Sequence, residues 1–162
     1  MAPLRLARFI ALFLLVIGST QPVVHASDTA GAFDLQRYRG KVVVVDFWAS
    51  WCAPCRQSFP WLNEIQSKYA DQGLVVIGVN VDREQADAEK FLKDVPAEFK
   101  ILFDPEGQLA AKYDIPGMPS SYVFDADGRL ISKHIGFRNG ARAERETELQ
   151  DALAAHSRSA RR

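Results

Sequence analysis

The stretch Lys41–Arg56, KVVVVDFWASWCAPCR, determines the fold and contains both cysteines of the 162-residue chain. Its first half is a continuous run of β-branched and aromatic residues, which is typical of a strand buried on both faces. Its second half begins a helix, because Pro54 stands where a first turn leaves its N–H groups unpaired and apolar residues then recur at helical spacing. Cys52 and Cys55 therefore lie where a buried strand passes into a helix.

This position predicts different roles for the two cysteines. Backbone N–H groups and the dipole of a helix N-terminus stabilise a thiolate at Cys52. Cys55 lies about one turn further on the same face, close enough to form a disulfide with Cys52. We expect Cys52 to be a nucleophile that attacks a disulfide and Cys55 to resolve the mixed disulfide that results.

Asp46 interrupts the apolar strand six residues before Cys52. A carboxylate is costly to bury without a function, so Asp46 is the candidate acceptor of the Cys55 proton. The alternative is a strand-end aspartate that faces solvent or caps a neighbouring loop.

A cysteine pair can also form a passive disulfide or bind a metal ion. A passive disulfide would close a loop of two residues, which constrains the unfolded chain very little. Two thiolates can also hold Cu(I) or share a zinc site, but other soft or nitrogen donors such as Met118 and His134 are distant in sequence. We expect no metal and no cofactor. The alternative function is a copper-binding carrier or chaperone that uses the same pair without turnover.

The rest of the chain predicts an α/β domain. A second buried strand follows the helix and makes a β-α-β unit, whose crossover is long enough for parallel strands. Two later strands flank the turn Asp125–Gly128, which predicts an antiparallel hairpin. The expected elements are strands at 41–48, 74–81, 101–103, 121–124 and 130–135, and helices at 53–70, 83–94, 108–113 and 141–155.

The first 26 residues have the pattern of a secretory signal peptide. Arg5 and Arg8 precede the apolar segment Phe9–Gly18, and Val24-His25-Ala26 provides a cleavage site. An uncleaved anchor is the alternative, but this segment is shorter than the ~20 residues that cross a bilayer. We expect cleavage after Ala26, a domain at 27–156 and a flexible basic tail at 157–162. With 20 basic and 20 acidic residues, the composition does not indicate a nucleic-acid-binding protein.

These motifs resemble the thioredoxin fold. The resemblance rests on DFWASWCAPCR, on Pro60 five positions after Cys55, and on Gly117-Met118-Pro119 before the strand SSYVFD. More narrowly, the chain is similar to the secreted TlpA/ResA-like thiol:disulfide oxidoreductases, with an extra strand and helix at 98–113 before the proline loop. The resemblance implies a mixed central sheet with flanking helices, a cis Pro119, and a docking surface that includes Trp51 and the Met118 backbone.

The resemblance also implies partners and a location. We expect a periplasmic or otherwise extracytoplasmic monomer, not inserted in a membrane after cleavage, that reduces protein disulfides and is itself reduced by a membrane or periplasmic reductant. An oxidase or isomerase is the alternative direction. Cytochrome c maturation, copper-site assembly and general thiol repair are not distinguished. Two positions depart from the pattern: Ser58 replaces a glutamate of several relatives, and Gly78 matches a lysine that thioredoxins place near their buried aspartate.

Overall fold

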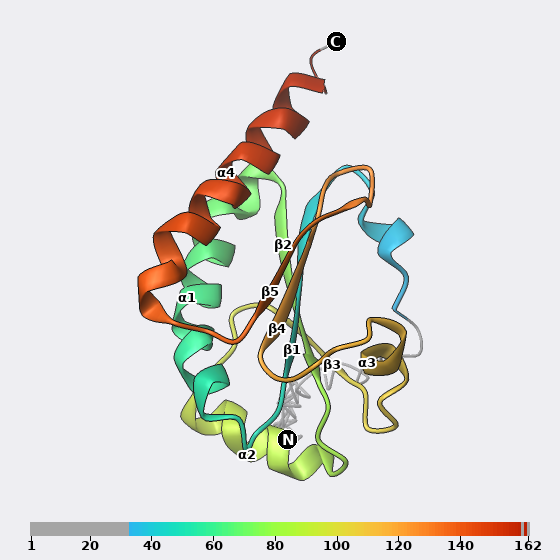
Figure 1. The fold of residues 1–162 in the computed structure, drawn as a ribbon, viewed down its shortest axis with the longest axis vertical. Coiled ribbons are helices and arrows are strands. Elements are labelled where there is room, and N and C mark those ends of the chain that lie inside the picture. Colours follow the sequence, from blue (N-terminus) through green and yellow to red (C-terminus); the bar gives the residue numbers. More distant parts are fainter. Residues whose placement is uncertain (1–32, 160, 162) are drawn as a thin grey trace, which may run out of the picture.

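One mixed sheet organises the computed structural model, which describes residues 33–159 and 161. The sheet contains β1 (Val42–Trp48), β2 (Leu74–Asn80), β3 (Lys100–Phe103), β4 (Ser120–Phe124) and β5 (Leu130–Ile135). Their order across the sheet is β3-β2-β1-β4-β5. The β1–β2 and β2–β3 pairs are parallel, whereas β1–β4 and β4–β5 are antiparallel. This topology confirms the expected β-α-β unit, the added strand and the antiparallel end (Figure 1).

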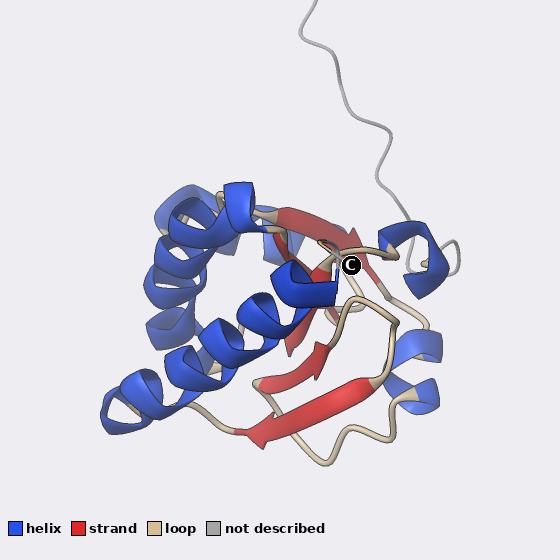
Figure 2. Ribbon diagram, turned by 90° about the horizontal axis from the view of Figure 1, so that it is seen from above, coloured by secondary structure: helices blue, strands red, loops and turns tan. Residues whose placement is uncertain are grey.

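Helices cover both faces of this sheet. They are α1 (Ala53–Tyr69), α2 (Gln85–Asp94), α3 (Gln108–Lys112) and α4 (Arg142–Ser159), with short 3-10 turns η2 (Leu35–Tyr38), η3 (Ala70–Gln72) and η4 (Asn139–Ala141). The long helices α1 and α4 lie on one face, and α3 and η2 lie on the other (Figure 2). Among the described residues, none of these helices combines the length and apolar character needed to span a bilayer.

Two expected boundaries concern the ends of the chain. The predicted signal peptide, residues 1–26, lies outside the described residues. At the other end, α4 continues to Ser159, three residues into the segment 157–162 that we expected to be a flexible tail. The helix persists because the helical spacing of Leu149 and Leu153 keeps its inner face on the core over the preceding turns.

All seven residues of β1 are buried, as its sequence predicts for a central strand. Alternate residues face opposite sides: Val42, Val44 and Trp48 pack on the side of α1 and α4, and Val43 and Val45 on the side of α3. By the same alternation, the charged residue of the strand, Asp46, faces α1 and α4. The fold therefore places a carboxylate between the centre of the sheet and its main helical layer.

An aromatic cluster holds the N-terminal half of α1 against the sheet. The Trp48 ring lies 4.9 Å from that of Phe59 and 4.8 Å from that of Phe91, centroid to centroid. Fully burying each large apolar side chain of this kind contributes about 1.5–3 kcal/mol. This packing fixes the end of β1 relative to the start of α1, which is where the two cysteines lie.

Gly78 of β2 has no side chain, and neighbouring apolar side chains fill the space above it. Gly78 pairs with Asp46 in the sheet, and a Cβ built on it would lie 2.9 Å from side-chain atoms of Phe99 and Ile101 and 3.1 Å from Trp48 Nε1. Contacts below 3 Å require neighbouring side chains to shift. The glycine therefore allows apolar side chains to pack directly over β2 beside the buried carboxylate.

We predict that Gly78→Ala lowers the free energy of unfolding by about 1–3 kcal/mol, because the added methyl overpacks this layer. Urea denaturation followed by circular dichroism measures the change. The control is Gly140→Ala, because a Cβ at Gly140 meets nothing within 4 Å. Equal stability of Gly78→Ala and the wild type would contradict the close packing described for β2.

Candidate active site

Cys52 and Cys55 form a disulfide at the N-terminus of α1, with their Cα atoms 5.3 Å apart. Cys52 is the N-cap residue, and its Sγ accepts a hydrogen bond from the Cys55 N–H at 3.2 Å. Cys52 is 5% exposed and Cys55 is fully buried. The helix N-terminus thus stabilises negative charge on the sulfur that is nearer to solvent.

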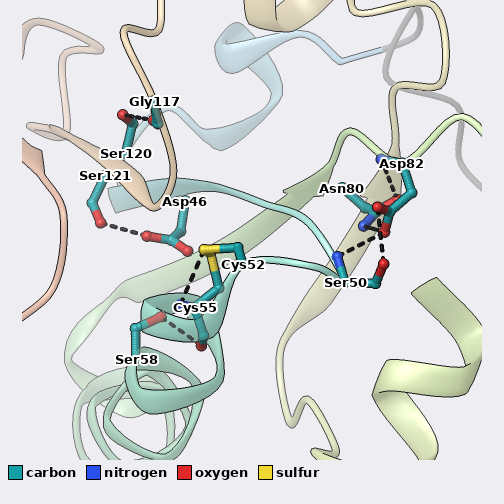
Figure 3. Close-up of a disulfide and its surroundings, with 10 residues drawn as sticks. All are labelled: Asp46, Ser50, Cys52, Cys55, Ser58, Asn80, Asp82, Gly117, Ser120 and Ser121. Carbon is teal, nitrogen blue, oxygen red and sulfur yellow. Dashed lines mark hydrogen bonds between the residues drawn. A yellow bond between two sulfur atoms is a disulfide. The ribbon is translucent and has the colours of Figure 1, made fainter. Parts of the chain in front are cut away.

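Asp46 is fully buried and does not face solvent, which rules out the exposed strand-end alternative. Its carboxylate points toward the disulfide, and Ser121 lies on its other side (Figure 3). The Ser121 hydroxyl donates a hydrogen bond to Asp46 Oδ1, and Oδ2 has no partner among the described residues. Burial raises the pKa of Asp46 to about 7, against the opposing effects of the Ser121 hydrogen bond and the charge of Arg145. A carboxyl group with this pKa can accept and return a proton at neutral pH.

The cation near Asp46 comes from α4. Gly78 stands beside Asp46 on β2, where the resemblance to thioredoxins would place a lysine. Arg145 supplies positive charge from the opposite side, with its guanidinium 5.5 Å from the Phe137 ring and Nη2 donating to the Gly136 carbonyl at 2.8 Å. Burial lowers the pKa of Arg145 from its ordinary value, and the charge of Asp46 opposes that shift.

A second carboxylate, that of Asp82, fixes the loop that leads into Cys52. Asp82, just after β2, accepts hydrogen bonds from the Ser50 N–H at 2.9 Å, the Ser50 hydroxyl at 3.1 Å and the Asn80 amide at 2.7 Å. Asp82 and Asn80 are buried (Figure 3). Because Ser50 precedes Trp51 and Cys52, these bonds fix the backbone that leads into Cys52, and the Trp51 side chain is 70% exposed.

The proline loop reaches the same edge of the sheet. The Met118–Pro119 peptide bond is cis, as the resemblance implies. Ser120 pairs with Phe47, so the loop before β4 lies beside the end of β1. The Pro119 carbonyl accepts from Gly136 N–H at 2.8 Å, and the half-buried Met118 packs on the core layer under α1. The structure therefore places this loop and the helix that begins at the cysteines at the same end of β1.

Ser58, which stands where several relatives have glutamate, does not take over proton transfer. It is buried in α1, and its hydroxyl donates to the Cys55 carbonyl at 3.0 Å. Asp46 is therefore the buried carboxyl group that faces the disulfide.

The chain is similar in sequence to known disulfide oxidoreductases. Residues 17–133 match the AhpC/TSA family. The chain is 30% identical to the thiol-disulfide oxidoreductase ResA of Bacillus cereus over 121 residues, which cover 74% of this chain and 70% of the relative. It is 34% identical to ResA of Geobacillus thermodenitrificans over 115 residues, 70% of this chain and 66% of the relative.

A solved structure agrees with these relatives. A Chlorobium tepidum protein described as the thiol:disulfide interchange protein DsbE is 48% identical, with a TM-score of 0.72 over 74% of this chain and 84% of that one. The sheet, the disulfide at a helix N-terminus and the cis-proline loop together define a disulfide oxidoreductase of thioredoxin fold. The chain belongs to the AhpC/TSA family.

Two charged residues around this site were not identified from the sequence alone. Arg145 lies four residues before Leu149 and eight before Leu153, so it occupies the apolar line of α4, and a charge on that line was the available signal. Asp82 follows the second strand of the β-α-β unit. Parallel strands end at the same edge of a sheet, and this rule could have placed Asp82 beside the cysteine loop.

The raised pKa of Asp46 predicts a pH-dependent stability of the oxidised protein. The unfolded chain ionises Asp46 near its ordinary pKa of 3.8, whereas the folded protein ionises it at about 7. The stability contributed by the protonated form is therefore complete below about pH 4 and is lost as the pH rises through about 7, a change of about 4 kcal/mol. Urea denaturation across this range measures the loss.

Asp46→Asn should remove that pH dependence and leave the variant more stable than the wild type above pH 7. Asp71→Asn, which alters an exposed aspartate, serves as the control and should keep the wild-type profile. Parallel pH profiles for the wild type and Asp46→Asn would contradict the burial of an ionisable Asp46.

Proposed function

We propose that this protein is an extracytoplasmic oxidoreductase that reduces disulfides in partner proteins through Cys52 and Cys55, with Asp46 as the proton acceptor. The observation that carries the proposal is a buried carboxyl group, with a pKa of about 7, that points toward a disulfide at a helix N-terminus. This combination supplies a stabilised thiolate, a second sulfur within bonding distance and a base in one place.

The reaction follows from the positions of the three groups. The Cys52 thiolate attacks a substrate disulfide, one substrate sulfur leaves as a thiolate, and a mixed disulfide forms. Asp46 accepts the Cys55 proton, and the Cys55 thiolate attacks Cys52 Sγ and displaces the second substrate thiolate. The substrate disulfide gains two electrons, and the Cys52–Cys55 dithiol loses them and becomes the disulfide seen in the structure.

Substrate docking is assigned to the surface beside Cys52. Trp51 is the most exposed large apolar side chain of the described residues, at 70%. An exposed tryptophan next to the nucleophile suits a protein segment better than a small thiol, because tryptophan contributes strongly to protein interfaces. Met118 and Pro119 lie at the same edge, where an extended substrate segment can pair with the loop backbone.

Direction and location rest on the sequence. Ala53-Pro54 between the cysteines resembles the dipeptides of reductants, which implies an upstream membrane or periplasmic reductant that regenerates the dithiol. The signal-peptide pattern of residues 1–26 supports export.

An insulin-disulfide reduction assay tests the activity. The wild type, supplied with dithiothreitol, should accelerate insulin precipitation, and Cys52→Ser should reduce the rate to that of dithiothreitol alone, because no nucleophile then forms the mixed disulfide. Equal turnover by the wild type and Cys52→Ser would contradict the proposal.

Trapping in the native host tests the partner class. Cys55→Ser should accumulate mixed disulfides with protein substrates, because Cys52 then attacks but no second thiol releases the product. A reductant should cleave these adducts and release the partner proteins. The double variant Cys52→Ser, Cys55→Ser should form no such adducts. Exported proteins among the adducts support the proposal, and exclusively cytosolic ones contradict the location.

A further inference from the structure

The strand β5 forms one edge of the sheet, and no other strand of the described chain pairs with its outer side. The Gly136 N–H donates to the Pro119 carbonyl at 2.8 Å, and these two residues are directly opposite in the β4–β5 register. Opposite pairs in an antiparallel ladder alternate between hydrogen-bonded and non-bonded. The N–H and C=O groups of Lys133 and Ile135 therefore point away from β4 and are free to pair with an added strand.

Exposed apolar side chains are concentrated on this strand. Three of the four large apolar side chains that are exposed in the described chain belong to β5: Leu130, Ile131 and Ile135. The fourth is Trp51, beside Cys52. Each of the three is about half exposed, so a segment that adds to the edge buries apolar surface and forms main-chain hydrogen bonds at the same time.

A bulge divides these apolar side chains between the two faces of the sheet. The register shifts at the end of β4, which makes Ile131 the additional residue of β5. Ile131 lines an open hollow of about 550 Å³ between the β4–β5 turn and the end of α4, together with Ala152 and Ala155. The α4 side of the edge therefore has room for a side chain of an added segment.

The face of β5 on the side of α3 carries an apolar, a basic and an apolar side chain in a row: Leu130, Lys133 and Ile135. They share this face because their partners on β4 alternate with Ser121, which points towards α1 and α4. The Lys133 ammonium lies 5.0 Å from the centroid of the Tyr122 ring. Lys133 forms no ion pair with a carboxylate of the described residues, so its positive charge is available at the edge.

We propose that β5 is a docking edge for an extended segment of a partner protein in which apolar and acidic residues alternate, and that this segment adds to the sheet beside β5. An acidic side chain of the segment faces Lys133, and the apolar side chains that flank it cover Leu130 and Ile135. A lysine and a bulge at a sheet edge prevent indiscriminate pairing, so this edge selects a segment by its charge.

A second copy of this chain does not supply that charge. The sequence of β5, LISKHI, contains no acidic residue, so two β5 strands placed side by side leave both Lys133 side chains without a carboxylate from the facing strand. The edge therefore favours a different protein over self-association.

Docking at β5 goes beyond the proposed function, because it needs neither cysteine. Ile135 pairs with Ser120, next to the cis-proline loop. A partner held along β5 therefore reaches the end of the sheet at which the disulfide lies.

Hydrogen exchange of single backbone amides tests the strand pairing. The isotope-labelled oxidised protein is followed by NMR with and without the synthetic peptide acetyl-TVTETVT-amide, in which valine and glutamate occupy alternate positions. At saturating peptide, the amides of Lys133 and Ile135 should exchange about tenfold more slowly, because the added strand accepts their hydrogen bonds. The amide of His134 points to β4 and is the internal control, which should not change.

Reversal of one charge tests the chemistry of the partner. Lys133→Glu should weaken binding of this peptide about fivefold and should strengthen binding of acetyl-TVTKTVT-amide, because it reverses the charge pair across the edge. Lys133 is exposed, so the change leaves the core intact. Lys93→Glu makes the same change in net charge on α2 and should bind both peptides as the wild type does.

Three results would overturn the proposal. They are unchanged exchange of Lys133 and Ile135 when the peptide is added, equal affinity of the wild type for the two peptides, and slow exchange of both amides in a free protein that sediments as a dimer. The insulin assay is independent of this docking. Intact insulin reduction without docking would leave the proposed function standing, and docking without insulin reduction would overturn the proposed function alone.

Discussion

The burial of one carboxyl group at the centre of a sheet constrains the rest of this structure. An ionised Asp46 without water costs several kcal/mol, so its surroundings must offer a hydrogen bond, a counter-charge or a proton. Ser121 supplies the hydrogen bond, and Arg145 supplies the charge. These two groups offset only part of the cost of burial, so the pKa of Asp46 stays near 7, and the proposed role of Asp46 as a proton acceptor depends on that value.

The two sides of Asp46 differ in polarity. Towards β2 stands Gly78, and the side chains of Phe99, Ile101 and Trp48 fill the space above it, which makes that side apolar and closed. Towards β4 lie Ser121 and the buried Arg145. An arginine on a helix can be held by a backbone carbonyl and an aromatic ring at once, so its charge acts on the carboxylate from a fixed position.

The strand ends explain why separate segments meet at the disulfide. Parallel β1 and β2 end at one edge, and antiparallel β4 begins there, so the Ser50 loop, Asp82 and the cis-proline loop converge without long connections. The hydrogen bonds of Asp82 to Ser50 hold the loop while α1 packing holds the helix. Cys52 is therefore positioned from both sides of the strand-to-helix junction.

Local pattern in the chain was enough to predict the five strands, the main helices and the paired cysteines, because periodicity and spacing are properties of neighbouring residues. It also singled out Asp46 as a carboxylate in an apolar strand, but it did not decide whether that side chain is buried. The cis bond at Pro119 followed from the likeness to a family. The partners of Asp46 are determined by the tertiary structure. Arg145 lies almost a hundred residues away in the sequence. Ser121 and His134 lie near Trp61 only because of the strand register and the packing of the helices on the sheet. The charge around a buried group depends on which distant side chains pack near it, and no local pattern encodes that.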